Sequence, residues 1–161
     1  MLSWLLMACT PSYNWREVSL ADGAVKAFFP DKPLTQERPL NYSGHELRFS
    51  LITATVDEAM FAVGYALLPE ALRGASEKSQ ELASTVLASL YQNMGVEPPT
   101  QLPELGKPFT IEGKSAQRPT RMRATIWLTD HALIEGIVMA GQAPFPEQEA
   151  DEFLRGLQVA R

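Results

Sequence analysis

Hydrophobic and polar residues alternate along much of the chain, and this alternation predicts antiparallel strands. Within residues 46–56, Leu47, Phe49 and Leu51 alternate with polar side chains, and residues 60–68 show a similar alternation after a turn at Asp57. Successive side chains of a strand point to opposite faces, so each segment has one apolar face to bury. The two segments are therefore predicted to pair as long neighbouring strands.

Other segments show the same period of two, bounded by turn residues. Asp22-Gly23 is a strong turn signal between two short predicted strands, the second of which alternates, and it predicts a hairpin. The prolines that follow it interrupt regular pairing, so residues 34–40 are expected to form an extended edge or a loop. The predicted strands are residues 15–20 and 24–29 in the hairpin, and 109–117, 121–129 and 132–140 in a later meander.

Two segments show a helical period instead. Residues 76–94 repeat apolar side chains every three to four positions, with Ser76 as a candidate N-cap and Gly95 where a left-handed residue ends a helix. A short closing helix is predicted from Pro146. One face of the strand at residues 60–68 carries mostly small side chains, including Gly64, which indicates that the long helix packs there.

Strand runs separated by single helices predict an α+β fold. We expect a mostly antiparallel sheet of about six to seven strands with one long and one short helix packed on it. This layout resembles the PsbP-like fold, known from an extrinsic photosystem II subunit and from small bacterial envelope lipoproteins. The resemblance rests on the order of elements, with the Phe28-Phe29-Pro30 entry, the strand ending at Leu68-Pro69, the long helix and the closing helix.

Composition narrows the class of protein. The chain has 161 residues, 45% hydrophobic and 20% charged, which suits one folded domain. The net charge of −5 argues against a nucleic-acid partner. A single cysteine, Cys9, excludes an internal disulfide, and no apolar run reaches the ~18–20 residues of a membrane-spanning helix.

The lone cysteine ends a short apolar run, Leu6-Met7-Ala8-Cys9. This run resembles the end of a bacterial lipoprotein signal peptide, in which Leu6 and Ala8 would fit the signal peptidase and Cys9 would be acylated. The charged start of such signals is missing, so we expect the true start to lie upstream. In such lipoproteins of enteric bacteria an Asp after the cysteine signals retention in the inner membrane, so Thr10 at this position favours the outer membrane. The alternative is an unrelated apolar N-terminus. We expect residues 1–14 to hold the signal remnant, lipid attachment and linker, and residues 15–161 to form the domain.

The sequence offers little catalytic chemistry. His45 and His131 fall in predicted turns, and neither has a second ligand at metal spacing. No Gly-x-Ser-x-Gly turn and no glycine-rich phosphate loop is present. We therefore expect no catalytic residues, no metal and no other cofactor.

An arginine group is the most suggestive polar feature. Arg121 and Arg123 share a predicted strand face with Trp127, and Arg48 would join them if its strand were a neighbour. Guanidinium groups beside an aromatic surface suit a carboxylate, a phosphate or an anionic polymer. The alternative is that these arginines lie over an exposed sheet face and pair with glutamates.

Two classes of function remain. We favour a non-catalytic lipoprotein domain of the bacterial cell envelope, tethered through Cys9 and facing the periplasm. It would bind a protein partner or a small ligand and assist envelope assembly, transport or maintenance. The alternative is a hydrolase-like enzyme with an unrecognised site built from carboxylates or arginines. A deep pocket lined by perturbed carboxylates would favour the enzyme.

Overall fold

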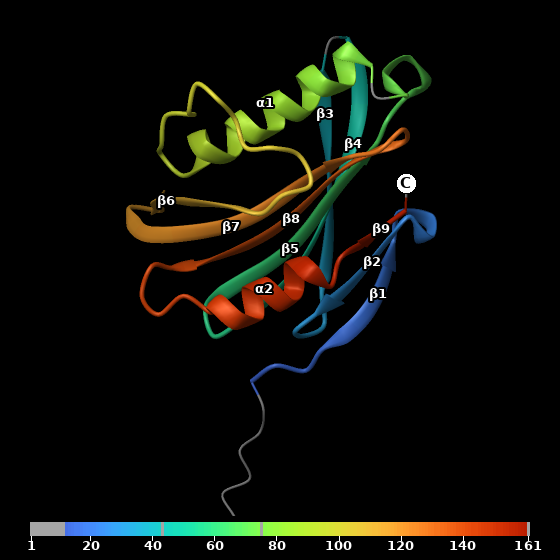
Figure 1. Cartoon of the computed structure of the whole chain (residues 1–161). Coiled ribbons are helices and arrows are strands. Elements are labelled where there is room, and N and C mark those ends of the chain that lie inside the picture. Colours follow the sequence, from blue (N-terminus) through green and yellow to red (C-terminus); the bar gives the residue numbers. More distant parts are fainter. Residues whose placement is uncertain (1–11, 43, 75, 161) are drawn as a thin grey trace, which may run out of the picture.

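A six-stranded antiparallel sheet forms the centre of the protein (Figure 1). The computed structural model describes residues 12–42, 44–74 and 76–160. The predicted pair of long strands and the predicted meander are both in this sheet, and the segment expected at an edge is its first strand. In spatial order the strands are β3 (Leu34–Tyr42), β4 (His45–Val56), β5 (Ala59–Leu67), β8 (Ala132–Gly141), β7 (Arg118–Leu128) and β6 (Phe109–Ser115).

The N-terminal hairpin forms a separate small sheet, so the prediction of a single sheet is wrong. Its strands β1 (Arg16–Leu20) and β2 (Val25–Phe29) pair as predicted, and β2 also pairs with a two-residue strand, β9 (Gln158–Val159). A segment as short as β9 has no readable periodicity. The alternation in β1 and β2 predicts that the hairpin has one apolar face. It does not specify whether the hairpin joins the central sheet at an edge or packs against it as a separate sheet.

The two helices cover opposite faces of the central sheet (Figure 1). The long helix α1 (Glu77–Asn93) lies on one face, and α2 (Glu147–Arg155) lies on the other beside the small sheet. Two short 3-10 turns, Ala21–Gly23 and Glu70–Leu72, complete the elements of the described chain. Among residues 12–42, 44–74 and 76–160, no helix is both long and apolar enough to cross a membrane.

Each face of the sheet has its own hydrophobic core. Between the central sheet, the small sheet and α2, Phe153 meets Phe29 and Phe61 with ring centroids 5.5 and 5.4 Å apart. On the other face, Leu82, Leu87 and Leu90 of α1 pack on the central sheet. The predicted apolar face of the long helix is thus confirmed.

The ends of α1 are fixed by local contacts. The backbone N–H of Ser79 donates to Ser76 Oγ at 3.2 Å, which confirms the predicted N-cap. At the other end Gly95 has the left-handed φ of 67° that the sequence indicated. The N–H of Lys114 donates to the carbonyl of Met94 at 2.9 Å and ties this end to β6. The C-terminal end of α1 is therefore anchored at the β6 edge of the sheet.

Candidate ligand-binding site

A cleft of about 460 Å³ opens between α1 and the central sheet. All six strands of the central sheet contribute to its walls, and α1 forms one side with Val86, Ser89 and Leu90. Most of its lining is apolar. Ligand pockets in proteins typically have this size and character, with a few polar groups that orient the ligand.

Four methionines lie along this cleft. In the strand register Met60 pairs with Met139, and Met139 pairs with Met122, so three of them lie side by side across β5, β8 and β7. Met94 at the end of α1 also lines the cleft. Methionine side chains are flexible and polarisable, which lets a surface adapt to apolar ligands of different shapes.

The polar group in the floor of the cleft is Glu135. Its side chain lies in the middle of β8, directly opposite Gly64 of β5, and is only 6% exposed. A Cβ atom added at Gly64 would lie 2.7 Å from Glu135 Oε1 and 2.7 Å from the ring of Phe49. Gly64 therefore makes room for the carboxyl group and the Phe49 ring. The prediction that a helix approaches here does not account for Gly64, although its neighbour Ala62 does pack in the core beneath α1.

The carboxyl group of Glu135 has no hydrogen-bond or ion-pair partner within the described part of the chain. Every fully buried side-chain oxygen of that part has a hydrogen-bond partner. Since the Glu135 oxygens have none there, they are not fully enclosed, and they open on the cleft. Burial raises the pKa of Glu135 from its usual 4.5 to about 7. The group thus changes charge near neutral pH.

Glu135 lies at one end of the cleft, and the methionine side chains lie at the other. Glu135 and Met139 are four residues apart on the same face of β8, a separation of about 13 Å along an extended strand. Ile137 lies between them and also lines the cleft. An elongated molecule with one polar end fits this arrangement.

The predicted arginine group forms an ion-pair cluster with α2 and β6. Arg121 contacts Glu112 Oε1 through Nη2 at 2.6 Å and Glu147 Oε1 through Nη1 at 2.8 Å. Arg123 contacts Glu147 Oε2 at 2.6 Å and Asp151 Oδ1 at 2.9 Å. The hydrogen bond to Arg123 is the largest of the effects that hold the pKa of Glu147 below its usual value, and the charges of both arginines add to it.

Both guanidinium groups also lie over the ring of Phe145, with Cζ atoms 5.5 and 5.3 Å from its centroid. The structure brings Arg121 and Arg123 together, as the sequence suggested, but it also provides their counter-ions. An added anion would have to displace these carboxylates. The geometry favours the alternative of arginines paired with acidic residues.

Trp127 and Arg48 lie away from this cluster. Trp127 is six residues from Arg121 along β7, about 20 Å in an extended strand. β4, which carries Arg48, is not a neighbour of β7, because β5 and β8 lie between them. The condition under which Arg48 would join the group is not met.

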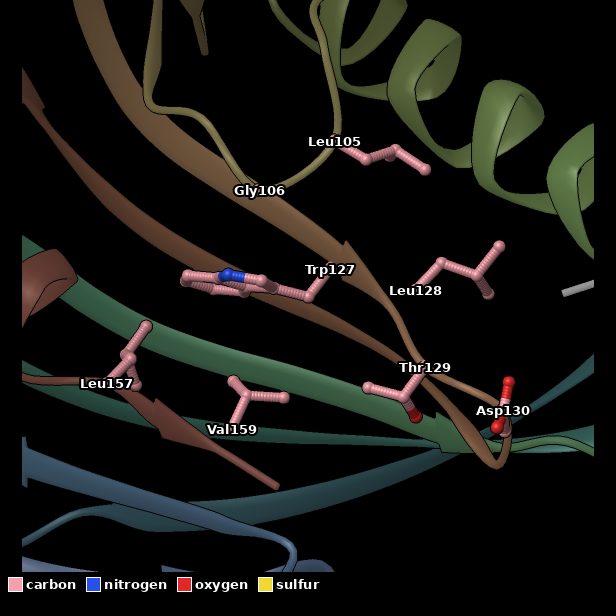
Figure 2. Close-up of a pocket in the computed structure, with 8 residues that line it drawn as sticks. All are labelled: Leu105, Gly106, Trp127, Leu128, Thr129, Asp130, Leu157 and Val159. Atoms are coloured by element: carbon pink, nitrogen blue, oxygen red, sulfur yellow. The ribbon is translucent and has the colours of Figure 1, made fainter. Parts of the chain in front are cut away.

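Trp127 instead forms part of a second hollow of about 500 Å³ (Figure 2). Its indole ring lies between Leu105 on one side and Leu157 and Val159 on the other. Asp130 lines one end of the same hollow. This surface brings together β7, the loop before β6 and the C-terminal residues, which are distant in sequence.

The remaining sequence predictions have mixed outcomes. Cys9 lies outside the described residues. His131 is in the turn between β7 and β8, whereas His45 is the first residue of β4. Within residues 12–42, 44–74 and 76–160, no three His, Cys, Asp or Glu side chains gather as a metal site.

Sequence reasoning missed Glu135. The signal was present, since this residue is the one charged position in the apolar run of residues 132–140. A carboxylate in such a run is rarely buried without a reason. Its opposite residue, Gly64, was visible only once the strands had been paired.

Comparison with known proteins identifies no relative. Scans of protein-family models, curated proteins and solved structures found no match to the chain.

Proposed function

We propose that this protein is a non-catalytic envelope lipoprotein domain that binds a small amphiphilic ligand in the cleft between α1 and the central sheet. The observation that carries the proposal is the buried carboxyl group of Glu135, which opens on an apolar cleft and has no partner in the described chain. A buried polar group of this kind normally finds a hydrogen-bond partner. A bound ligand would supply it.

The rest of the cleft supports an amphiphile. Its volume of about 460 Å³ lies within the range of small-molecule sites. Each methylene group removed from water contributes about 0.8 kcal/mol, so a short alkyl chain over the methionines offsets a substantial part of the entropy lost on binding. One polar group at one end then orients the ligand.

The proposal includes a lipid tether at Cys9 that holds the domain at the bacterial envelope, facing the periplasm and favouring the outer membrane. Its support is the lipobox-like run before Cys9. The proposed fold identity is PsbP-like, supported by the order of strands and helices. Such a domain would assist transport, assembly or maintenance of envelope components by holding a ligand, or by presenting it to a protein partner.

The alternative of a hydrolase-like enzyme has less support. A carboxyl group that titrates near neutral pH is suited to general acid–base chemistry. Glu135 is the one acidic residue among the described residues that line the cleft, and no His, Cys, Lys or Tyr accompanies it there. Ser89, a possible nucleophile, donates its hydroxyl to the carbonyl of Val86 at 2.7 Å. The cleft therefore offers a binding group without a paired nucleophile and base.

Filling the cleft tests the proposed function. We expect the wild-type protein to bind the neutral fluorescent probe N-phenyl-1-naphthylamine, with a rise in its emission. Val86→Trp, which adds bulk on the half-buried α1 wall of the cleft, should remove this binding. Gln92→Trp on the exposed side of α1 is the matched control and should retain it. Equal binding by both variants would contradict the site.

The tether has its own test. Mass spectrometry of the protein isolated from its native membrane should show an acylated Cys9 at the mature N-terminus. An intact Met1 terminus would contradict lipid attachment without affecting the cleft.

A further inference from the structure

We propose that the ligand of the cleft carries a cationic amine, which pairs with Glu135 while its hydrocarbon chain lies toward the methionines. This inference rests on the proposed function and specifies the class of ligand. It follows from three features of the cleft, namely an unpartnered carboxyl group, the absence of a neutralising charge nearby, and an apolar path that leads away from it.

The position of the carboxyl group is fixed by its surroundings. Gly64 leaves space directly beside Glu135 Oε1, and the ring of Phe49 fills the space next to it. A charged carboxylate in such a place is poorly hydrated and needs a counter-ion or several donors. The described chain supplies neither. An ammonium group brings both a positive charge and N–H donors to the exposed oxygens.

No charge of the described chain replaces that counter-ion. The α1 residues that line the cleft are uncharged, as are those from β4, β5 and β7. Arg38 on β3 is the other charged lining residue, and it is exposed. Strands β4 and β5 separate β3 from β8, which places Arg38 about 14 Å from Glu135 across the sheet. In the described part of the chain Arg38 forms no ion pair with Glu135.

The sign of the head group follows from these positions. A carboxylate or phosphate head group in the floor of the cleft would face Glu135 and be repelled by it. A neutral alcohol would bind through the alkyl chain and one ordinary hydrogen bond. A primary ammonium adds a charge-assisted hydrogen bond in a cleft with a mostly apolar lining, where such bonds are stronger than in water. A cationic amphiphile is therefore favoured over the other two.

Three ligands of equal chain length separate these possibilities. Octylammonium, octan-1-ol and octanoate would each be titrated as competitors of the naphthylamine probe at pH 8. We expect octylammonium to bind wild-type protein about ten-fold more tightly than octanol, which corresponds to one charge-assisted hydrogen bond. Octanoate should bind more weakly than octanol. Glu135→Gln should remove the preference for the amine, whereas Glu46→Gln, an exposed substitution on β4, should keep it.

The dependence on pH gives a second readout. Because the pKa of Glu135 is raised to about 7, the carboxyl group is mostly neutral at pH 5.5. The advantage of octylammonium over octanol should then shrink toward that of Glu135→Gln.

The outcomes distinguish the inference from the function on which it rests. Equal affinity for octylammonium and octanol, or an amine preference that survives in Glu135→Gln, would overturn the cationic ligand and leave the apolar site intact. Failure of the probe and all three competitors to bind would overturn the proposed function itself. An amine preference that is lost both in Glu135→Gln and at pH 5.5 supports the inference.

Discussion

Replacing Glu135 by glutamine should change how the stability of the protein depends on pH. In the folded protein burial raises the pKa of this carboxyl group from 4.5 to about 7. The folded state therefore holds the proton more tightly than the unfolded state, and loss of the proton favours unfolding. The contribution of Glu135 to stability is fully present below pH 4.5 and is lost as the pH rises through about 7.

The size of this effect follows from the two pKa values. One unit of pKa difference is equivalent to about 1.4 kcal/mol, so an interval from 4.5 to about 7 corresponds to about 3 kcal/mol. Most of it, about 2.5 kcal/mol, is lost between pH 5 and pH 8. Glutamine has a similar shape and does not titrate in this range, so Glu135→Gln removes this part of the pH dependence.

Urea unfolding at pH 5 and pH 8 measures the prediction directly. The free energy of unfolding of wild-type protein, relative to Glu135→Gln, should fall by about 2–3 kcal/mol between these pH values. The comparison at two pH values cancels the constant cost of burying an amide in place of an acid. Glu46→Gln serves as the exposed control. Parallel pH profiles for wild type and Glu135→Gln would refute the reasoning that Glu135 is buried without a partner.

Three further variants test other contacts of the fold. Gly64→Ala places a Cβ 2.7 Å from Glu135 Oε1 and the Phe49 ring, and should lower the urea unfolding free energy by about 1–3 kcal/mol; an unchanged midpoint would mean that the strands shift freely. Ser76→Ala removes the N-cap of α1 and should cost about 1 kcal/mol, with Ser84→Ala as an exposed α1 control; equal stability would deny the cap a role. Arg121→Ala combined with Arg123→Ala should lower the melting temperature, and less so in high salt, because it removes an ion-pair cluster. An unchanged melting temperature with weaker binding of an anionic envelope component would instead support the anion site.

The elements of this fold were readable from the sequence because they depend on local periodicity. The alternation around Leu47 and the four-residue repeat of the long helix each define an apolar face without knowledge of the partner. The cap at Ser76 and the left-handed Gly95 are equally local, since they involve neighbours in the chain. The α+β class follows from the order of these elements.

The candidate site depended on contacts between distant segments. Glu135 faces Gly64 only because β8 pairs with β5 in one register, and a shift by one residue would place it on the other face. Arg121 and Arg123 are poor candidates for an anion site because α2, more than 20 residues later, places Glu147 and Asp151 against them as counter-ions. The hairpin likewise forms a separate sheet because of contacts with distant segments, namely β9 and the core that it shares with α2.

The sequence by itself determined which segments form strands and helices, and which side of each is apolar. The tertiary structure decided which charged groups meet a counter-ion and which do not. An isolated apolar pattern specifies that a surface is buried but not what covers it, whereas the free energy of a carboxyl group depends on every charge and dipole around it. For that reason the sequence marks Glu135 only as a charged position in an apolar run, whereas the fold makes it the buried polar group of an apolar cleft.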